Sequence, residues 1–356
     1  MNIKIHSSEL NRMMKTVSQC IDERVLKFGN IEISTGNNVF TIRGTDGQCA
    51  ATTYTPLLGT EEEKFCIDGS MFAKACSICT GDITILTEGK FCVIKGNGRT
   101  RLPIVKAEVP EYVSLDGENP TVLVKAEDFS SAYTSVLHAI SSDQSRIQLT
   151  GVLTEVDEYG LRMTSLDGFR MAVETVACDG DPMKVIIPAG FMKLIQSSIA
   201  AGETVKIVTD EKRIEASTDG MKITCGLLVG EFPDVARIIP NEFKTECIVN
   251  VEQIRTALRS SSVLNNKSNL VKITVNGNVM KVSSNSEQVD YEADVECDTH
   301  GNGLTIAFNQ KYLTDAFASI DCENAIMQFN TPTSPCVIHG KDQNGIRLAL
   351  PVRVAG

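Results

Sequence analysis

The chain has 356 residues, which is too long for one ordinary hydrophobic core and suits three domains of common size. Its 42% hydrophobic and 22% charged residues are typical of a globular protein and exclude a disordered or collagen-like chain. The formal net charge of −11 argues against a protein that wraps its whole surface on nucleic acid, because phosphate binding needs a basic surface, but it leaves room for a local basic patch.

The first predicted elements are a short strand and an amphipathic helix between Ile3 and Cys20. The helix is indicated by apolar residues at helical spacing, namely Leu10, Met13, Met14 and Val17. We expect Ser7 or Ser8 as its N-cap and Glu9 in its first turn, where the helix dipole favours an acid. The chain starts without the apolar stretch of a signal peptide, and no apolar run is long enough to span a bilayer, so we expect a cytoplasmic location.

Further along the chain, alternating apolar and polar residues predict β-strands. Examples are residues 82–87 and 91–94, which follow a short predicted helix at residues 71–76. Asp-Gly and Asn-Gly pairs predict hairpin turns at residues 46–47, 97–98, 219–220 and 276–277. Helices combined with hairpin-connected strands indicate an α+β fold with antiparallel sheets.

The same order of elements occurs three times, at a spacing of about 120 residues. A strand end followed by a helix start recurs at residues 67–72, 187–192 and 308–313, and a strand–helix pair opens each block at residues 3–20, 122–140 and 248–264. We therefore predict three repeated domains over residues 1–119, 120–243 and 244–356, separated by short polar linkers. Short linkers favour a rigid arc, and its unpaired edge strands favour self-association into a ring.

Patterns for catalysis and metal binding are weak. The four histidines have no metal-like or nucleophile-like spacing with cysteine or acidic residues; they are His6, His138, His300 and His339. Cys76 and Cys79 lie late in a predicted helix, and we interpret them, like the other cysteines, as reduced apolar residues. Gly96 and Gly98 are interpreted as a hairpin turn, and no Gly-Lys-Ser/Thr loop occurs. We predict no enzymatic activity, no metal and no cofactor.

Four motifs occur in a fixed order on this threefold repeat. They are Asp167-Gly168-Phe169-Arg170-Met171-Ala172, Gly230-Glu231-Phe232-Pro233-Asp234 with Arg237, Phe308-Asn309-Gln310-Lys311-Tyr312-Leu313, and Leu350-Pro351-Val352-Arg353. Together, and over the full length, they resemble the bacterial DNA polymerase III beta sliding clamp family. The resemblance implies a homodimeric ring of six domains, with helices lining the hole and antiparallel sheets outside. It also implies loading by a clamp loader ATPase, sequence-independent enclosure of duplex DNA, and tethering of DNA polymerase III.

The resemblance further implies a site, between the second and third blocks, that binds short peptides of polymerases and other client proteins. The matching positions are Leu149, Leu166, Gly168, Phe169, Arg170, Met171, Pro233, Arg237, Ile238, Tyr312, Leu348, Leu350, Pro351, Val352, Arg353 and Val354. An apolar site with a few polar anchors suits a peptide that carries Leu or Phe and a Gln. Core packing is the alternative role for Leu348 and Ile238. Leu166 and Val352 depart from the family pattern, which bears on peptide preference.

The resemblance also suggests DNA contacts and a dimer contact. Arg24 and the loop at Gln144 match positions where the family touches DNA. Basic residues on predicted helices are further candidates to line the hole, and they also fit ordinary solvated helix faces; they are Arg12, Lys15, Lys74, Lys193, Arg255 and Arg259. Apolar family positions at the dimer contact match Leu102, Val263 and Leu264.

The sequence thus predicts a DNA sliding clamp, a processivity factor without catalytic activity of its own. The first alternative is a repeat-built protein-interaction scaffold that does not enclose DNA. A weaker alternative is an enzyme whose site the motifs do not reveal. Retention on closed circular DNA, with loss after linearisation, separates the clamp from the scaffold.

Overall fold

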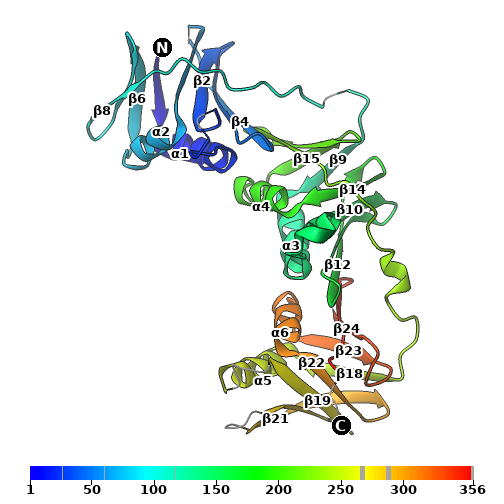
Figure 1. Cartoon of the computed structure of the whole chain (residues 1–356). Helices are drawn as coiled ribbons and strands as arrows, with labels where there is room; N and C mark the ends of the chain where they lie inside the picture. Colours follow the sequence, from blue (N-terminus) through cyan, green and yellow to red (C-terminus); the bar gives the residue numbers. More distant parts are fainter. Residues whose placement is uncertain (26, 60, 116, 265–268, 286–289, 354–356) are drawn as a thin grey trace. The chain divides into compact units, whose positions relative to one another are not determined.

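The computed structural model describes residues 1–25, 27–59, 61–115, 117–264, 269–285 and 290–353, and at residues 263 and 264 it describes the backbone only. The chain packs into two compact units (Figure 1). Unit 1 contains Met1–Phe129, Cys178–Pro182 and Gly190–Leu227. Unit 2 contains Ser130–Ala177, Met183–Ala189 and Leu228–Gly356.

Unit 1 combines α-helices with antiparallel strands. Its helices are α1 (Ser7–Val17), α2 (Gly69–Ser77), the start of α3 (Ala126–Val136) and nearly all of α4 (Ala189–Ser198). Its strands are β1 (Asn2–His6), β2 (Asn30–Gly36), β3 (Val39–Thr45), β4 (Cys49–Pro56), β5 (Glu63–Asp68), β6 (Asp82–Glu88), β7 (Phe91–Lys95), β8 (Arg99–Pro103), β9 (Thr121–Lys125), β13 (Asp179–Gly180), β15 (Thr204–Thr209), β16 (Arg213–Thr218) and β17 (Met221–Gly226). They form one sheet in the order β1-β6-β7-β8 and another in the order β13-β9-β15-β16-β17-β4-β3-β2-β5.

Unit 2 holds the rest of α3 and the helices α5 (Val251–Leu264) and α6 (Gln310–Ala318). Its strands are β10 (Gly151–Asp157), β11 (Gly160–Leu166), β12 (Arg170–Val176), β14 (Met183–Pro188), β18 (Thr245–Asn250), β19 (Leu270–Asn276), β20 (Val279–Asn285), β21 (Asp290–Gly301), β22 (Leu304–Asn309), β23 (Asn324–Phe329), β24 (Cys336–Gly340) and β25 (Ile346–Ala349). They are connected in the order β14-β10-β11-β12-β25-β24-β23-β18-β21-β20-β19-β22.

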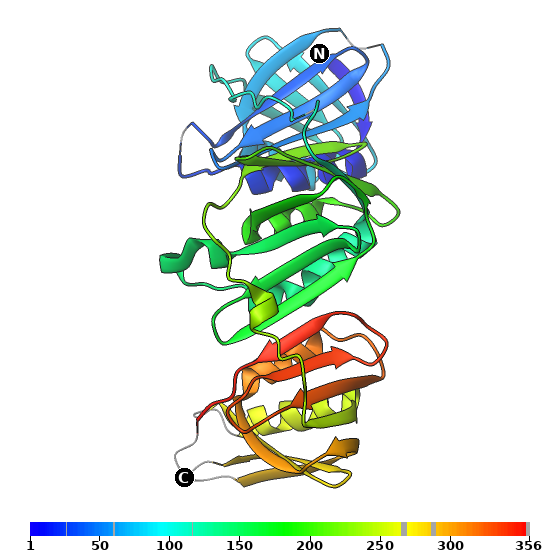
Figure 2. The ribbon, with the colours of Figure 1, turned by 90° about the vertical axis from the view of Figure 1, so that its right-hand side faces the viewer.

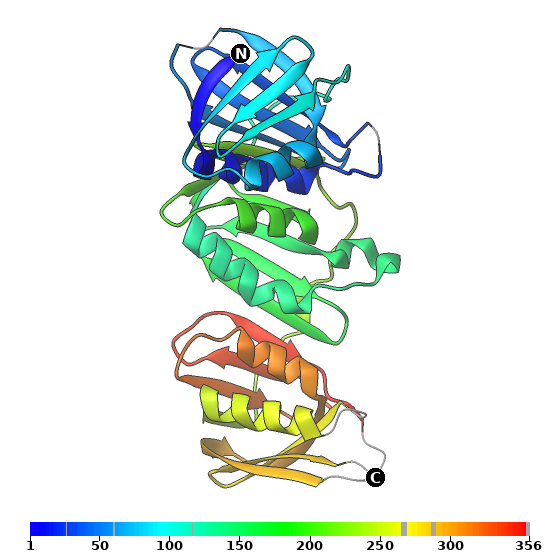
Figure 3. The same ribbon diagram turned by 90° about the vertical axis from the view of Figure 1, so that its left-hand side faces the viewer.

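The α-helices of each unit lie on one side of its strands. Figure 3 shows α5 and α6 in front of the strands of unit 2, and Figure 1 shows α1 and α2 below the strands β2 and β6 of unit 1. Figure 2 shows the strands from the opposite side. Helices α1 and α2 pack against each other, as do α5 and α6. The predicted α+β class with antiparallel sheets is therefore confirmed.

Helix α1 forms where the apolar spacing predicts it, but its cap differs from the prediction. Four side chains at helical spacing are buried, namely Leu10, Met13, Met14 and Val17. The N-cap is His6, whose extended backbone ends β1 and whose Nδ1 accepts a hydrogen bond from the Ser8 backbone N–H at 3.3 Å. The prediction of Ser7 or Ser8 as the cap was wrong, because Ser7 already lies inside the helix and is buried.

The repeated strand-to-helix junction is confirmed in all three blocks, as β5–α2, β14–α4 and β22–α6. Two of these helices are capped in the same way. Asp68 accepts a hydrogen bond from the Met71 N–H, and Asn309 accepts one from the Lys311 N–H. The four predicted hairpin turns also occur, between β3 and β4, β7 and β8, β16 and β17, and β19 and β20.

Two strand pairs join the predicted blocks within the units. In unit 1, β4 of the first block pairs with β17 of the second, and in unit 2, β12 of the second block pairs with β25 of the third. The packing units therefore divide the chain differently from the sequence repeat, because extended sheets cross the block limits. The boundaries at residues 119 and 243 stay a prediction.

The cysteines are free thiols, and Cys76 and Cys79 are buried around the end of α2, as a core role requires. Burial raises the pKa of the Cys76 thiol above its usual range. Among the described residues, the helices are too short or too polar to cross a membrane.

Candidate peptide-binding site

Unit 2 contains a small apolar cluster that is separate from the core around α5 and α6. Its buried members are Leu149, Leu166, Met171, Val337 and Leu348. Partly buried side chains pack against them, namely Val173, Phe232, Val235, Ile238, Ile239, Phe243, Ile346 and Leu350. The structure thus brings together six of the residues that the resemblance selects. We refer to this set as the apolar cluster.

Strand register explains why residues so distant in sequence meet here. Met171 on β12 lies opposite Leu348 on β25, and Leu348 lies opposite Val337 on β24. Three adjacent antiparallel strands therefore place three apolar side chains in one row, where cross-strand pairs stabilise a sheet. Val337 was missed by the sequence reasoning, although the consecutive apolar residues at the start of β24, Cys336 to Ile338, are a signal for a buried strand.

The turn between β11 and β12 presents Phe169. The Asp167 carboxylate accepts hydrogen bonds from the backbone N–H groups of Phe169 at 2.9 Å and Arg170 at 3.0 Å. Gly168 has a φ of +92°, a conformation that side-chain-bearing residues rarely adopt. The turn leaves the Phe169 side chain 59% exposed, which is unusual for a large aromatic residue and makes it available to a ligand.

Helix α6 supplies the neighbours of this turn. The rings of Phe169 and Tyr312 stack with centroids 6.4 Å apart, and the Arg170 guanidinium lies 4.7 Å from the Tyr312 ring centroid. Arg170 also donates hydrogen bonds to Asp167 at 2.9 Å and to Asp315 at 2.6 Å. Burial by itself would raise the pKa of Asp315, but hydrogen bonds from Arg170 and Lys311 outweigh it and lower the pKa. The ionic contacts therefore fasten the turn to α6.

The C-terminal segment runs along the same surface. The Leu350 N–H donates to the Phe169 carbonyl at 2.8 Å, and the Val352 N–H donates to the Ala307 carbonyl at 2.7 Å. Pro351 forms an isolated bridge with Phe308. Val352 and Arg353 are exposed, and Val354 lies outside the described residues. Backbone contacts thus hold Leu350 beside the Phe169 turn, and Pro351 and Val352 against β22.

Arg237 ends a short 3-10 helix, Val235–Arg237, that is capped by Asp234, and Pro233 precedes this cap. Both side chains are exposed, and Arg237 forms an ion pair with Asp234 at 3.0 Å. Because Val235 and Ile238 pack on the apolar cluster, this segment forms part of its border. Arg237 therefore places a positive charge at that border, and its side chain packs little against other residues.

A group of buried charges lies close to the site, and sequence reasoning missed it. Arg347 on β25 is 1% exposed and donates to the Glu174 carboxylate on β12 at 3.0 Å. It also donates to the Ser319 hydroxyl at 2.9 Å and to the Ser319 carbonyl at 3.0 Å. His138 lies near Arg170 and Arg347, and its Nδ1 is buried.

His138 should make stability depend on pH. Burial, helped by the charges of Arg170 and Arg347, lowers the pKa of His138 from 6.5 to about 4. As pH falls below 6.5, the unfolded chain takes up a proton that the folded chain still excludes, so stability decreases down to about pH 4. The shift corresponds to about 3 kcal/mol. Urea unfolding at pH 7 and pH 4.5 should show a smaller loss in His138→Gln; an equal loss would contradict the assignment.

The predicted DNA-contacting residues lie in both units, and most are exposed. Lys15, Lys74, Lys193 and Arg259 have exposed side chains on α1, α2, α4 and α5, and Gln144 is exposed at the start of a 3-10 helix. Arg24 is 89% exposed and pairs with Asp22 at 2.9 Å.

Two of the basic residues already have partners. Arg12 is half-buried and ion-paired with Glu9 at 2.7 Å. Arg255 donates to the carbonyl oxygens of Phe317 and Ile320, at the end of α6. These contacts leave Arg255 fewer free donors for a phosphate than the exposed lysines have.

The predicted dimer residues are only partly described. Leu102 lies on β8, the last strand of its four-stranded sheet, and is buried at 7% exposure. Val263 and Leu264 belong to α5, but their side chains lie outside the described residues. The edge position of β8 fits a strand that another chain could cover.

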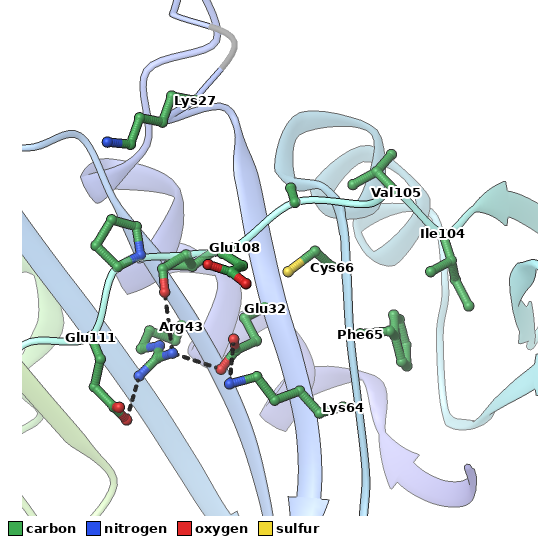
Figure 4. A pocket seen from close by; sticks show the side chains of 13 residues that line it. Lys27, Glu32, Arg43, Lys64, Phe65, Cys66, Ile104, Val105, Glu108 and Glu111 are labelled. Atoms are coloured by element: carbon green, nitrogen blue, oxygen red, sulfur yellow. Dashed lines mark hydrogen bonds and ion pairs between the residues drawn. The ribbon is translucent and has the colours of Figure 1, made fainter.

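A cavity of about 670 Å³ lies elsewhere, on unit 1, and Figure 4 shows its lining. Glu32 is nearly buried and pairs with Arg43 at 2.9 Å and Lys64 at 2.8 Å. Arg43 pairs in addition with Glu111 and donates to the Val109 carbonyl. These contacts tie the extended segment at residues 104–111 to β2, β3 and β5, so the charges of this cavity largely neutralise one another.

Comparison with known proteins gives the family. A model of the DNA polymerase III beta subunit central domain matches residues 123–234, and a model of its C-terminal domain matches residues 236–353. The chain belongs to this family. The two matched ranges contain every predicted peptide-binding residue except Val354.

Individual relatives agree over the whole length. A beta sliding clamp from Vibrio cholerae is 23% identical, with 99% of this chain and 100% of the relative covered. The crystal structure of the beta subunit from Thermotoga maritima has a TM-score of 0.91 at 24% identity, over 99% of this chain and 100% of that one. A Pseudomonas aeruginosa sliding clamp bound to griselimycin has a TM-score of 0.93 at 22% identity, with the same coverage.

Proposed function

We propose that this chain is a DNA sliding clamp. Two copies form a ring that encircles duplex DNA without sequence preference, and the ring tethers DNA polymerase III and other client proteins. The ring stays on DNA because it encloses the duplex, and the chain has no catalytic step of its own. A clamp loader ATPase opens and closes the ring, in the cytoplasm. The observation that carries this proposal is the family match across residues 123–353, together with full-length similarity to beta sliding clamps.

Three domains over residues 1–119, 120–243 and 244–356 make up each half of the proposed ring. The dimer contact joins Leu102 on the β8 edge of one copy to Val263 and Leu264 of the other. Exposed Lys15, Lys74, Lys193 and Arg259, with Arg24 and Gln144, face the DNA phosphates. These contacts involve the charged phosphates and do not read the bases. The ring can therefore slide along the duplex. Arg12 and Arg255 contribute less, since both already have protein partners.

Client peptides bind on the apolar cluster. An apolar peptide side chain packs on the cluster between Phe169, Ile238 and Leu350, and polar peptide groups pair with Arg170 or Arg237. The exposure of Phe169 and its stacking on Tyr312 support this role, because aromatic side chains commonly anchor interfaces. The Pseudomonas aeruginosa clamp of similar fold is bound to griselimycin in its crystal structure, which supports a ligand-binding role for this fold.

The function is tested by retention on DNA of different topology. Purified protein, a clamp loader and ATP are incubated with nicked circular DNA, and free protein is removed by gel filtration. We expect the protein to stay with the circle and to dissociate after a restriction enzyme linearises it, because a ring slides off an open end. Equal retention on circular and linear DNA would instead indicate direct binding. No retention on either, with intact peptide binding, would favour the interaction scaffold.

A further inference from the structure

Two cysteines of unit 1 face each other across neighbouring strands. Cys49 begins β4, and Cys225 lies directly opposite it near the end of β17. Their sulfur atoms are 3.2 Å apart, and both thiols are free. The two residues are far apart in sequence and belong to the first and second predicted blocks. Their contact therefore depends on the β4–β17 pairing.

The register makes this pair suitable for a covalent bond. The Tyr54 N–H donates to the Gly220 carbonyl, and these residues are also opposite each other, one step beyond the Thr53–Met221 pair. Hydrogen-bonded pairs recur every second residue in an antiparallel ladder, so Cys49 and Cys225 occupy a non-hydrogen-bonded pair. Opposite Cα atoms there lie about 4.5 Å apart, within the range of roughly 4.4–6.8 Å that disulfides span.

The pair is also more accessible than the nearby Cys20 thiol, and its hydrogen bond favours a thiolate at Cys225. Cys49 follows the turn at residues 46–48 and is only half-buried, and Cys225 is 8% exposed, whereas the nearby Cys20 is fully buried. The Cys49 thiol donates a hydrogen bond to the Cys225 sulfur. This bond lowers the pKa of Cys225 and outweighs burial, which acts in the opposite direction. A thiolate is the form of cysteine that attacks a peroxide oxygen.

We propose that Cys49 and Cys225 form an oxidation site at which a hydroperoxide, such as hydrogen peroxide, produces a reversible disulfide. The Cys225 thiolate attacks one peroxide oxygen, the O–O bond breaks, and Cys225 becomes a sulfenic acid while hydroxide leaves. The Cys49 sulfur then attacks the Cys225 sulfur, the S–O bond breaks, and water leaves. In total, two thiols lose two electrons and two protons, and one peroxide is reduced to two waters.

The disulfide would fasten the joint between two blocks. β4 and β17 are the strands at which residues 30–68 and residues 121–226 meet in the nine-stranded sheet. A bond there closes a loop across 176 residues of sequence. Such a bond restricts the unfolded chain and prevents separation of β4 from β17. Oxidation would therefore make this joint rigid without any change in the strand pairing.

Peptide mapping tests the proposal on the full-length protein. The protein is treated with hydrogen peroxide, remaining thiols are blocked with N-ethylmaleimide, and trypsin is added without reductant. Cleavage after Arg43 and Lys64 releases Cys49, and cleavage after Lys222 and Arg237 releases Cys225, each in a peptide with no other cysteine. We expect a disulfide-linked pair of these two peptides, two hydrogen masses below their sum, that disappears after treatment with dithiothreitol.

Variants complete the test. Cys49→Ser should lose the linked peptides and accumulate a dimedone-reactive sulfenic acid at Cys225, whereas Cys76→Ser, which removes a buried thiol elsewhere, should keep the link. Met71, which is 52% exposed, serves as an internal measure of peroxide exposure. The proposal is overturned if both target peptides stay fully alkylated while Met71 becomes oxidised, or if Cys225 links mainly to Cys20.

Discussion

Phe169→Ala is expected to weaken binding of a client peptide tenfold or more, about 1.4 kcal/mol or above. The side chain is 59% exposed and stacks on Tyr312, and the Phe169 carbonyl accepts a hydrogen bond from the N–H of Leu350, a member of the apolar cluster. Truncation removes an aromatic anchor that a peptide would bury, while the turn itself is held by Asp167 and Gly168. Fluorescence anisotropy of a labelled peptide carrying Gln, Leu and Phe measures the change in Kd.

Tyr159→Ala is the matched control. Tyr159 is an aromatic residue of the same unit with 73% exposure, in the hairpin between β10 and β11, at the opposite end of these strands from the Phe169 turn. Its truncation should leave peptide affinity within twofold of wild type, since surface side chains outside an interface contribute little. Similar affinities of Phe169→Ala and wild type, or an equal loss in Tyr159→Ala, would remove the basis for placing the peptide on the apolar cluster.

Local sequence patterns predicted most elements of the fold because their signals are local. The apolar spacing of Leu10 to Val17 and the strand-to-helix junctions of the three blocks depend on neighbours within a few residues. The pairing of β4 with β17 and of β12 with β25 could not be predicted in this way. These strands lie far apart in sequence, and nothing in either strand specifies its partner.

The candidate site also contains one part that could be predicted from the sequence and one part that could not. The resemblance selected Leu166, Met171 and Leu348, and the structure gathers them in one cluster. The resemblance could not reveal the buried ionic contacts close to this cluster. Arg347 lies between Ile346 and Leu348 in an alternating strand, a position that normally points to solvent. It is buried instead, because Glu174 and Ser319 provide its hydrogen-bond partners from other elements.

Arg347 joins three elements that surround the site. It lies on β25 opposite Ala172, its partner Glu174 lies on β12, and Ser319 follows α6. The Glu174 side chain is only 14% exposed, so its carboxylate depends on this guanidinium for compensation of its charge. One guanidinium nitrogen, Nη1, is buried without a hydrogen bond to any described residue. The Arg347–Glu174 pair therefore already includes one buried nitrogen without a hydrogen bond to the described residues, which is unfavourable. Replacing both charged residues together should therefore cost less than removing one of them.

Arg347→Ala should lower the free energy of unfolding by about 3–5 kcal/mol, because it leaves a buried carboxylate unpaired and creates a cavity. Urea unfolding followed by circular dichroism measures the loss. The double variant Arg347→Met with Glu174→Gln should recover much of it, since neither charge then remains and the volume is nearly kept. Arg162→Ala, which removes a partly exposed ion pair with Asp157, should cost less than about 1 kcal/mol. Equal losses in Arg347→Ala and Arg162→Ala would show that the buried charge pair does not hold the β12–β25 joint.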